Sequence, residues 1–429
     1  MKIAIAGYGV EGQSSYQYWA ADPANTITIV DQSETPKFAV PEGADVLLGA
    51  DAFEHLDGFD LVIRSPGLAP NKIKTDGKIW SATNEFFAAC PADIIGITGS
   101  KGKGTTASLI VSILEAAGHK VWLVGNIGVA ALDILPKIQM GDIVVYELSS
   151  FQLWDLERSP HTAVVLFIEP EHLDVHASME EYVAAKANIA KFQSAGDILV
   201  YNQDNEYARA IAETSPAITV GYPGELTAHI KDGFFYNGEQ KLCSVEALQL
   251  PGVHNQSNAL AAIDAIWKYV ESPSVIEAGL HAFKGLPHRL AFVRDVNGVK
   301  YYDDSIATTP ASLVAAIASF DQPKIIIIGG ADKGGDYRSV ARAIAGSDSI
   351  KAIISIGANG EHITSFLEEK DQRLVDRVDV KDMNEIVRVA ASYGAAGDIV
   401  ILSPAAASFD MFKNYADRGE QFVAAVHNL

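Results

Sequence analysis

A glycine-rich run, Gly96-Ile-Thr-Gly-Ser-Lys-Gly-Lys-Gly-Thr-Thr106, follows the apolar pair Ile94 and Ile95. This order of residues predicts a buried strand, a turn that carries Lys103, and a helix from about Thr105 to Ala117. Consecutive backbone N–H groups in such a turn form a concave anion site, and the positive end of the helix dipole adds to it. Lys103 supplies a mobile charge for a terminal phosphate, so the run favours a protein that handles a nucleoside triphosphate.

The run is not a perfect match to the phosphate-loop pattern. The first glycine of a strict match would fall at Ile97, and Gly104 stands where a hydroxyl should be, one residue before Thr105. The alternative is a glycine-rich turn that binds no ligand. We predict that the loop residues that contact a nucleotide are Gly99, Ser100, Lys101, Gly102, Lys103, Gly104, Thr105 and Thr106.

Short β-branched runs alternate with helical stretches along the chain, and the alternation starts afresh twice. Because 429 residues are too many for one ordinary core, we expect more than one domain. The pattern is typical of an α/β fold. We predict a Rossmann-like domain over residues 1–92, a central phosphate-loop domain over 93–285 and a second Rossmann-like domain over 286–429. The stretch from about Ala217 to Leu250 is expected to form a small antiparallel patch, with a hairpin at Phe234–Gly238.

The net charge of −21 argues against nucleic acid or an anionic membrane as a partner, because the field of the whole chain repels both. Two cysteines give neither a disulfide framework nor the spacing of a zinc site. No apolar run approaches the ~18 residues of a spanning helix, and the first residues lack the features of a signal peptide. We therefore expect a cytoplasmic enzyme.

The segment Gly7-Tyr-Gly-Val-Glu-Gly12 follows the first predicted strand, and Asp31 ends the second strand. These residues form a dinucleotide-binding fingerprint, including the acid about twenty residues further on. An NAD(P)-dependent dehydrogenase is therefore an alternative from another class. The fingerprint alone also fits the pyrophosphate of some other nucleotide, or no ligand.

Polar residues also follow the strands of the central region. Glu147 ends an apolar strand, and an acid beside a phosphate loop commonly completes a Mg²⁺ site. His172 follows the next strand and could coordinate a second metal, although a surface histidine is the simpler interpretation. Lys186 lies on a predicted amphipathic helix, and composition alone indicates a solvated lysine.

In the third region, three polar clusters follow three predicted strands. They are Asp303-Asp304-Ser305, the glycine-rich Gly329–Gly335 with Lys333, and Ser403–Ser408. Because the carboxyl ends of parallel strands meet at one sheet edge, we expect these clusters to line one crevice. Arg289 lies at the predicted domain junction, where its fork could reach a phosphate.

Taken together, ten ordered segments of the chain resemble the Mur ligase family over essentially its whole length. The closing Phe412-Lys-Asn-Tyr-Ala-Asp-Arg-Gly419 resembles most the branch that adds D-glutamate. The ten segments, all of which come before this closing stretch, are Thr98–Thr106, Gly125–Gly128, Glu147–Gln152, Glu171–Asp174, Tyr182–Lys186, His254–Asn258, Gly285–Arg289, Asp304–Thr308, Gly329–Gly335 and Ser403–Asp410.

The resemblance implies ATP-dependent amide synthesis in peptidoglycan precursor synthesis. UDP-N-acetylmuramoyl-L-alanine would be activated as an acyl phosphate and attacked by D-glutamate, with two Mg²⁺ ions and no nucleic acid or membrane partner, by a monomer. Alternatives within the fold are a sister ligase with another amino acid or acceptor and a folylpolyglutamate-type ligase. A non-catalytic nucleotide sensor is a further alternative.

The resemblance also implies residue roles. The catalytic residues would be Lys103, Glu147, His172 and Lys186, and the metal ligands Thr105, Glu147, His172 and a carbamate on Lys186. ATP would also contact Asn258, Arg289 and Asp304. The UDP substrate would contact Gly7, Tyr8, Gly9, Val10, Asp31, Gln32, Ser65, Asn126 and Ser149, so the fingerprint would bind UDP rather than a nicotinamide. D-Glutamate would contact Thr308, Lys333, Ser408 and Tyr415.

Four positions depart from the family pattern. Gly104 replaces the usual hydroxyl residue, as in the related folylpolyglutamate synthetases, and Ile306 stands where a lysine often follows Asp-Ser. Phe167 replaces a frequent asparagine, and Tyr415 stands where phenylalanine occurs. The first two departures bear on the contacts of the γ-phosphate and Mg²⁺.

Overall fold

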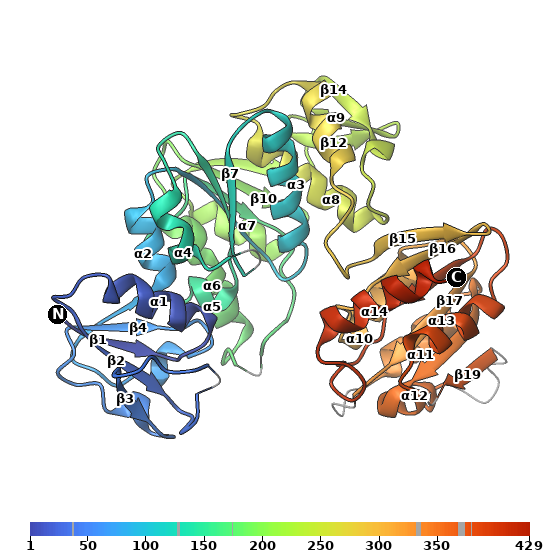
Figure 1. The fold of residues 1–429 in the computed structure, drawn as a ribbon. Coiled ribbons are helices and arrows are strands. Elements are labelled where there is room, and N and C mark those ends of the chain that lie inside the picture. Colours follow the sequence, from blue (N-terminus) through green and yellow to red (C-terminus); the bar gives the residue numbers. More distant parts are fainter. Residues whose placement is uncertain (37, 127–128, 174, 332–335, 368–373, 379) are drawn as a thin grey trace. The chain divides into compact units, whose positions relative to one another are not determined.

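The structure is a computed structural model that describes residues 1–36, 38–126, 129–173, 175–331, 336–367, 374–378 and 380–429. The chain forms two compact units (Figure 1). The first contains Met1–Leu248 and His254–Phe283, and the second contains Gln249–Val253 and Lys284–Leu429. No helix among the described residues has the length and apolar character needed to cross a bilayer.

The first ninety or so residues form a parallel sheet of order β3-β2-β1-β4-β5. Its strands are β1 Lys2–Ala6, β2 Thr26–Asp31, β3 Asp45–Leu48, β4 Leu61–Arg64 and β5 Lys78–Ser81, with helices α1 Val10–Ala20 and α2 Ala82–Ala89 and 3-10 turns Ala52–Glu54 and Pro70–Lys72.

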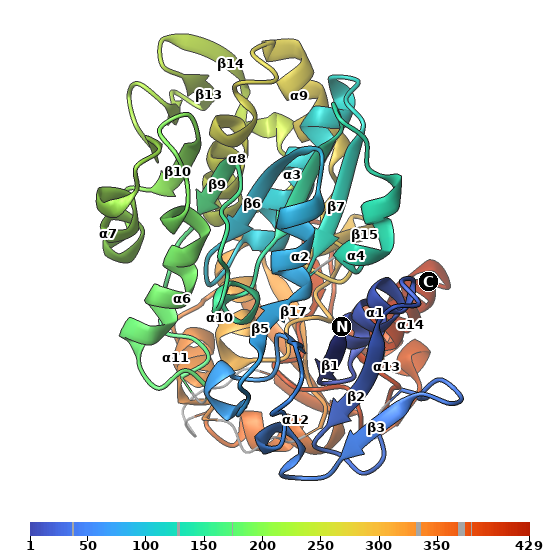
Figure 2. The ribbon, with the colours of Figure 1, turned by 90° about the vertical axis from the view of Figure 1, so that its left-hand side faces the viewer.

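A second parallel sheet has the order β11-β10-β9-β6-β8-β7. Helix α3 packs on β6, β7 and β8 (Figure 2). The strands are β6 Asp93–Thr98, β7 Val121–Gly125, β8 Ile143–Glu147, β9 Thr162–Val165, β10 Ile198–Asn202 and β11 Ile218–Tyr222. The helices are α3 Lys103–Ala116, α4 Ala131–Ile134, α5 Ser150–Leu153, α6 Met179–Lys191, α7 Glu206–Thr214, α8 Val253–Ile266 and α9 Pro273–Ala282.

The predicted antiparallel patch is present as the sheet β12 Ala228–Lys231, β13 Phe234–Asn237 and β14 Gln240–Ser244. The hairpin predicted at Phe234–Gly238 is confirmed. The predicted start of this patch, at about Ala217, is wrong, because Ile218–Tyr222 pairs parallel to β10 and extends the central sheet instead.

The second unit contains a sheet of order β15-β16-β20-β17-β18-β19, parallel except for β15, which pairs antiparallel to β16. The strands are β15 Ala291–Val296, β16 Val299–Asp303, β17 Lys324–Gly329, β18 Ile350–Ile356, β19 Leu374–Val378 and β20 Ile399–Leu402. The helices are α10 Pro310–Ala318, α11 Arg338–Ala345, α12 Gly357–Thr364, α13 Met383–Ser392 and α14 Tyr415–His427.

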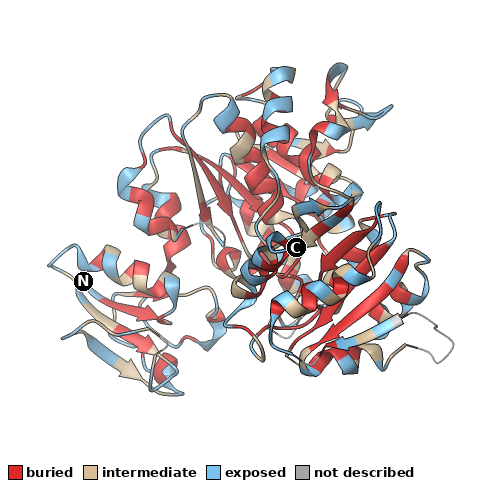
Figure 3. Cartoon of the chain, turned by 45° about the vertical axis from the view of Figure 1, so that its right-hand side comes forward, coloured by how far each residue is buried: buried red, intermediate tan, exposed pale blue. Residues whose placement is uncertain are grey.

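The central strands of the sheets are apolar on both faces. All six residues of β17 are buried, and so are most residues of β6 and β8 (Figure 3). Such continuous burial is typical of parallel sheets covered by helices on both sides. The predicted α/β fold class is therefore confirmed, while the boundaries near residues 92 and 285 stay predictions.

Candidate active site

Strand order gathers the predicted residues of the central domain at one sheet edge. Strand β6 lies between β9 and β8, and Ile97 of β6 is paired with Glu147 at the end of β8. The glycine-rich loop therefore leaves the sheet beside Glu147, and the segment that holds His172 follows β9 on the other side. The convergence expected from parallel strands is present.

The loop needs glycine at two positions. Gly99 has φ +152°, and a Cβ there would lie 2.7 Å from Cβ of Leu166. Gly102 has φ +87° and is the N-cap of α3, and its Cβ would lie 2.3 Å from Oδ1 of Asn258. The close approach of Asn258, on α8, therefore requires glycine at position 102. The helix itself begins at Lys103, two residues before the predicted start.

Ser100 fixes the loop against the segment after β9. Its backbone N–H donates to the carbonyl of Phe167 at 2.9 Å, and Oγ lies 2.9 Å from the carbonyl oxygen of Glu169. Oγ also lies 2.9 Å from the hydroxyl of Tyr182, on α6. These bonds hold the loop backbone in place before any ligand arrives.

Two lysines meet at one carbonyl oxygen of this loop. Nζ of Lys103 donates to the carbonyl of Gly99 at 3.0 Å, and Nζ of Lys186 donates to the same oxygen at 2.8 Å. Lys186 is buried, contrary to the solvated position that its helix pattern indicates. Burial, with added repulsion from Lys103, lowers the pKa of Lys186 well below its usual value. Lys186 therefore carries a larger share of neutral amine than a surface lysine.

Glu147 is buried, and only one of its oxygens has a partner. Oε1 accepts from Nδ2 of Asn126 at 2.9 Å, whereas Oε2 has no hydrogen-bond partner among the described residues. The hydroxyl of Thr106, on α3, is also buried without a hydrogen-bond partner among the described residues. Two buried oxygens without a partner among the described residues, beside the glycine-rich loop, match the hard oxygen ligands that Mg²⁺ prefers. No group of three or more acidic, histidine or cysteine side chains that could hold a metal ion is found in the described part of the chain.

His172 lies on the opposite side of the loop. It has φ +57°, its side chain is half-exposed, and its ring centroid is 5.0 Å from that of Phe151. Glu171 beside it forms an ion pair with Lys101. A side chain in this position could be one ligand of a metal ion whose other ligands come from further groups.

The fingerprint turn is held by Ser65. A Cβ at Gly12 would lie 2.2 Å from the carbonyl oxygen of Gly7, which accepts a hydrogen bond from Oγ of Ser65 at 2.6 Å. Oδ2 of Asp31 accepts from the N–H of Tyr8 at 2.9 Å. A Cβ at Gly9, by contrast, would meet no protein atom within 4 Å. The turn is therefore closed on its inner side and open at Gly9, while Val10 and Gln32 are exposed.

Ser149 caps α5 rather than projecting freely. Its Oγ accepts from the N–H of Gln152, and its own N–H donates to Oε1 of Gln152 at 3.0 Å, which completes a capping box. Ser149 thereby begins the helix that follows Glu147.

The three clusters predicted to share an edge in the second unit do so, since β16, β20 and β17 are neighbours. Asp304 accepts from Oγ of Ser403 at 2.8 Å and from the N–H of Leu290 at 3.2 Å. Burial raises the pKa of Asp304 to about 7. Ser408 is buried. Lys333 lies outside the described residues.

The remaining predicted residues of this unit are more open. Arg289 and Tyr415 are exposed and Thr308 is half-buried. Nδ1 of His288 lies 2.6 Å from Oδ2 of Asp303, which ties the segment before Arg289 to the end of β16.

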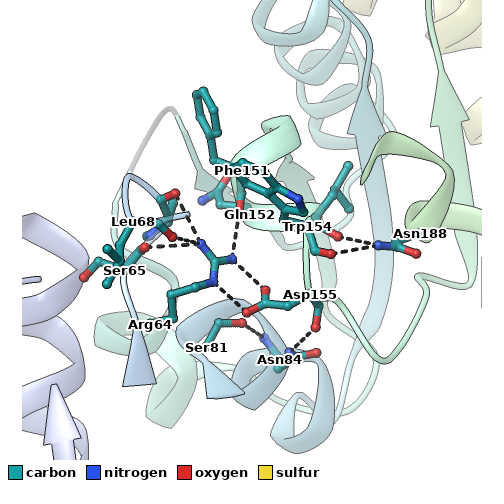
Figure 4. A network of polar contacts seen from close by, with 12 residues as sticks. Arg64, Ser65, Leu68, Ser81, Asn84, Phe151, Gln152, Trp154, Asp155 and Asn188 are labelled. Atoms are coloured by element: carbon teal, nitrogen blue, oxygen red, sulfur yellow. Dashed lines mark hydrogen bonds and ion pairs between the residues drawn. The ribbon is translucent and has the colours of Figure 1, made fainter. Parts of the chain in front are cut away.

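Two buried arginines support the predicted loops, and sequence reasoning gave neither a role. Arg418 of α14 donates from Nε to Oγ of Ser305 at 2.9 Å, from Nη2 to the carbonyl of Ser305 at 2.8 Å and from Nη1 to the carbonyl of Ala406 at 3.1 Å. Arg64, at the end of β4, likewise donates to a loop carbonyl, that of Leu68 (Figure 4). The sequence offers only the position of each arginine as a signal: Arg64 directly precedes Ser65, and Arg418 lies within the last matching segment.

Family models match the chain in two regions: the Mur ligase middle domain over residues 97–266 and the Mur ligase, glutamate ligase domain over residues 288–406. UDP-N-acetylmuramoylalanine--D-glutamate ligase of Acetivibrio thermocellus is 38% identical, with 100% of this chain and 96% of the relative covered. The enzyme of the same name from Clostridium tetani is 35% identical, covering 100% and 97%.

Solved structures share the fold at low identity. MurC of Thermotoga maritima superposes with a TM-score of 0.62 at 17% identity, covering 100% of this chain and 99% of the other. MurF of the same organism, in complex with ADP, gives 0.61 at 17% identity, covering 99% and 93%. E. coli FolC with ADP gives 0.60 at 17% identity, covering 81% and 92%.

Proposed function

The chain belongs to the Mur ligase family, and we propose that it joins D-glutamate to UDP-N-acetylmuramoyl-L-alanine with cleavage of ATP to ADP and phosphate. Relatives with this reaction in their name align with the whole chain. The product is a precursor of peptidoglycan.

The reaction proceeds by acyl transfer in two steps. A carboxylate oxygen of the acceptor attacks the γ-phosphorus of ATP, the bond to the β-phosphate oxygen breaks, and ADP leaves. The amine of D-glutamate then attacks the acyl carbon, the tetrahedral intermediate expels phosphate, and the nitrogen gives up its proton. The difficulty is electrostatic, because a carboxylate must meet a triphosphate inside a chain of net charge −21.

The observation that supports this chemistry most directly is the meeting of Lys103 and Lys186 at the carbonyl of Gly99, in the loop that follows β6, whose residue Ile97 is paired with Glu147 of β8. Lys103 and the N–H groups of the loop would bind the β- and γ-phosphates and offset the charge that develops during transfer. Asn258, in contact with Gly102, would also contact ATP. We propose the same role for Arg289 and Asp304.

The residues beside the loop fit Mg²⁺. Glu147, with Thr105 or the neighbouring Thr106, would hold one ion, and His172 with a carbamylated Lys186 would hold a second. Bound Mg²⁺ would neutralise phosphate oxygens and orient the γ-phosphoryl group. The neutral amine favoured at Lys186 is the form that reacts with carbon dioxide, and the resulting anion would replace repulsion from Lys103 by attraction.

Residues 1–92 would hold the UDP group through Gly7–Val10, Asp31, Gln32 and Ser65, with Asn126 and Ser149 along the muramoyl-alanine portion. The open side of the turn at Gly9 leaves room for the pyrophosphate. Residues 93–285 would hold ATP. Residues 286–429 would hold D-glutamate through Thr308, Lys333, Ser408 and Tyr415. We place the reaction in the cytoplasm, where ATP and UDP-sugars are made, and expect a monomer.

A screen of phosphate release tests the proposal. With ATP present, release should require both UDP-N-acetylmuramoyl-L-alanine and D-glutamate, and amino acids of the sister ligases or a folate acceptor should not replace them. Release with ATP alone, or hydride transfer with NAD(H), would contradict it. The Lys103→Ala variant should lose turnover while its affinity for the UDP acceptor is unchanged, and loss of both would refute the division between domains.

A further inference from the structure

Arg64, the last residue of β4, is buried with none of its side chain exposed. Nε and Nη2 donate to the two carboxylate oxygens of Asp155, each at 2.6 Å. Nη2 also donates to the carbonyl of Phe151 at 2.8 Å. Nη1 lies 2.9 Å from the carbonyl oxygen of Leu68 and 3.3 Å from those of Ser65 and Pro66 (Figure 4).

A buried guanidinium is tolerated only when its donors find acceptors. Here one edge of the planar guanidinium, Nε and Nη2, donates to a carboxylate in the bidentate geometry that arginine favours. The remaining nitrogen, Nη1, donates to carbonyl oxygens of a loop. A lysine, with a single ammonium group, cannot reach both sides from the same position.

The two sides of the fork belong to two different predicted sites. Leu68, Pro66 and Ser65 form the loop after β4, and Ser65 in turn bonds to the fingerprint turn at Gly7. Phe151 and Asp155 belong to α5 and the residues just after it, and α5 begins at the Ser149 cap, two residues after Glu147. One side chain thus joins the loop at the UDP site to the helix that follows the acid of the ATP site.

Further bonds join the same parts. Oε1 of Glu11, on α1 of the first domain, accepts from Nε2 of Gln152 at 2.7 Å, and Gln152 completes the Ser149 cap. Nδ2 of Asn84, on α2, donates to the carbonyl of Asp155 at 2.9 Å. These contacts hold α5 and the residues just after it against the first domain, with Arg64 at the centre (Figure 4).

We propose that Arg64, acting with Asp155, is a positioning residue that fixes the sugar-nucleotide loop against α5, so that the acceptor carboxylate arrives in line with the γ-phosphate. The inference rests on the proposed function. Arg64 touches neither reacting group, and its effect passes through the backbone of residues 65–68 and of α5. A displacement of about 1 Å between reacting groups can lower the rate about a hundredfold, so a loosened fork should reduce turnover.

The test compares Arg64→Lys with a matched control, Lys78→Met. Lys78, on β5, also forms an ion pair with a residue just after α5, Glu157, but both side chains are more than half exposed. For Arg64→Lys we expect kcat/KM for the UDP acceptor to fall about ten- to a hundredfold, mostly in kcat, with affinity for an ATP analogue within about twofold of the wild type. Lys78→Met should stay within about twofold in every constant.

Asp155→Asn provides a second variant if Arg64→Lys folds poorly, because it keeps the shape of the side chain and weakens only the charge-assisted bonds. Its effect should not add to that of Arg64→Lys in the double variant, since both act on one contact. The folded fraction of each variant at the assay temperature is read from its thermal melting curve, which circular dichroism records. Unchanged kcat in the folded variants, or a loss in proportion to the unfolded fraction, would overturn the inference. A wild type that releases no phosphate with acceptor and D-glutamate would instead refute the proposed function.

Discussion

Replacement of Gly102 by alanine tests the geometry of the phosphate loop. The residue has φ +87°, a conformation that costs an L-residue about 1–2 kcal/mol, and the new Cβ would lie 2.3 Å from Oδ1 of Asn258. Relief of that contact requires the loop or the amide to move by about 1 Å, and comparable overpacking costs about 1–3 kcal/mol. We therefore expect a total destabilisation of about 2–5 kcal/mol, and weaker binding of ATP because the loop N–H groups move.

Gly118, at the other end of α3, supplies the matched control. It has φ +85°, but a Cβ there would meet nothing within 4 Å, so Gly118→Ala should cost only the conformational share of about 1–2 kcal/mol. Urea unfolding compares the two variants, and titration with an ATP analogue measures binding. Asn258→Ala in the Gly102→Ala background should restore part of the stability but not the affinity. Equal destabilisation by the two glycine variants, with ATP affinity unchanged in both, would refute the reasoning.

Other predictions concern three buried charged groups. Lys186→Ala should abolish turnover, and an added short-chain carboxylate should restore part of it if a carbamate acts at this position; ordinary activity without rescue would reject the carbamate. Arg418→Lys should raise KM for D-glutamate about tenfold or more with little change in KM for ATP, because Arg418 holds the loops at Ser305 and Ala406; steady-state kinetics check this, and an unchanged KM would contradict it. Burial raises the pKa of Asp264 from 3.8 to about 7, so the folded chain binds more protons than the unfolded chain between these values. The contribution of Asp264 to the free energy of unfolding is therefore fully present below about pH 4. It is lost as the pH rises towards 7, at up to about 1.4 kcal/mol per pH unit. Asp264→Asn should flatten this decline in the urea midpoint between pH 5 and 7, and an unaltered slope would be evidence against it.

Much of the fold follows from local pattern. Runs such as Lys324–Gly329, with four consecutive isoleucines, are typical of the middle of a covered parallel sheet, and β17 lies there. Edge strands were harder to predict. β11 and β15 are mostly exposed or half-buried, so their hydrophobic pattern is weak, and their pairing depends on neighbours far along the chain.

In the candidate site, too, features set by local pattern were predicted and features set by distant neighbours were not. Glycine positions and strand ends placed the loop, Glu147 and the edge clusters, because these depend on local backbone geometry and sheet topology. The burial of Lys186 could not be derived from its helix pattern, because it depends on Tyr182 and the loop that pack over it. The roles of Arg64 and Arg418 were missed for a similar reason, since most of the acceptors that they contact are backbone carbonyls, which no sequence motif marks.

The central claim is that ATP at the Lys103 loop activates the carboxylate of a separately held acceptor as an acyl phosphate. The most direct measurement labels that carboxylate with a heavy isotope of oxygen and follows the label by mass spectrometry during turnover. The account predicts that one labelled oxygen appears in the released inorganic phosphate for each amide formed. Label in AMP, or label kept entirely in the amide product, would contradict it.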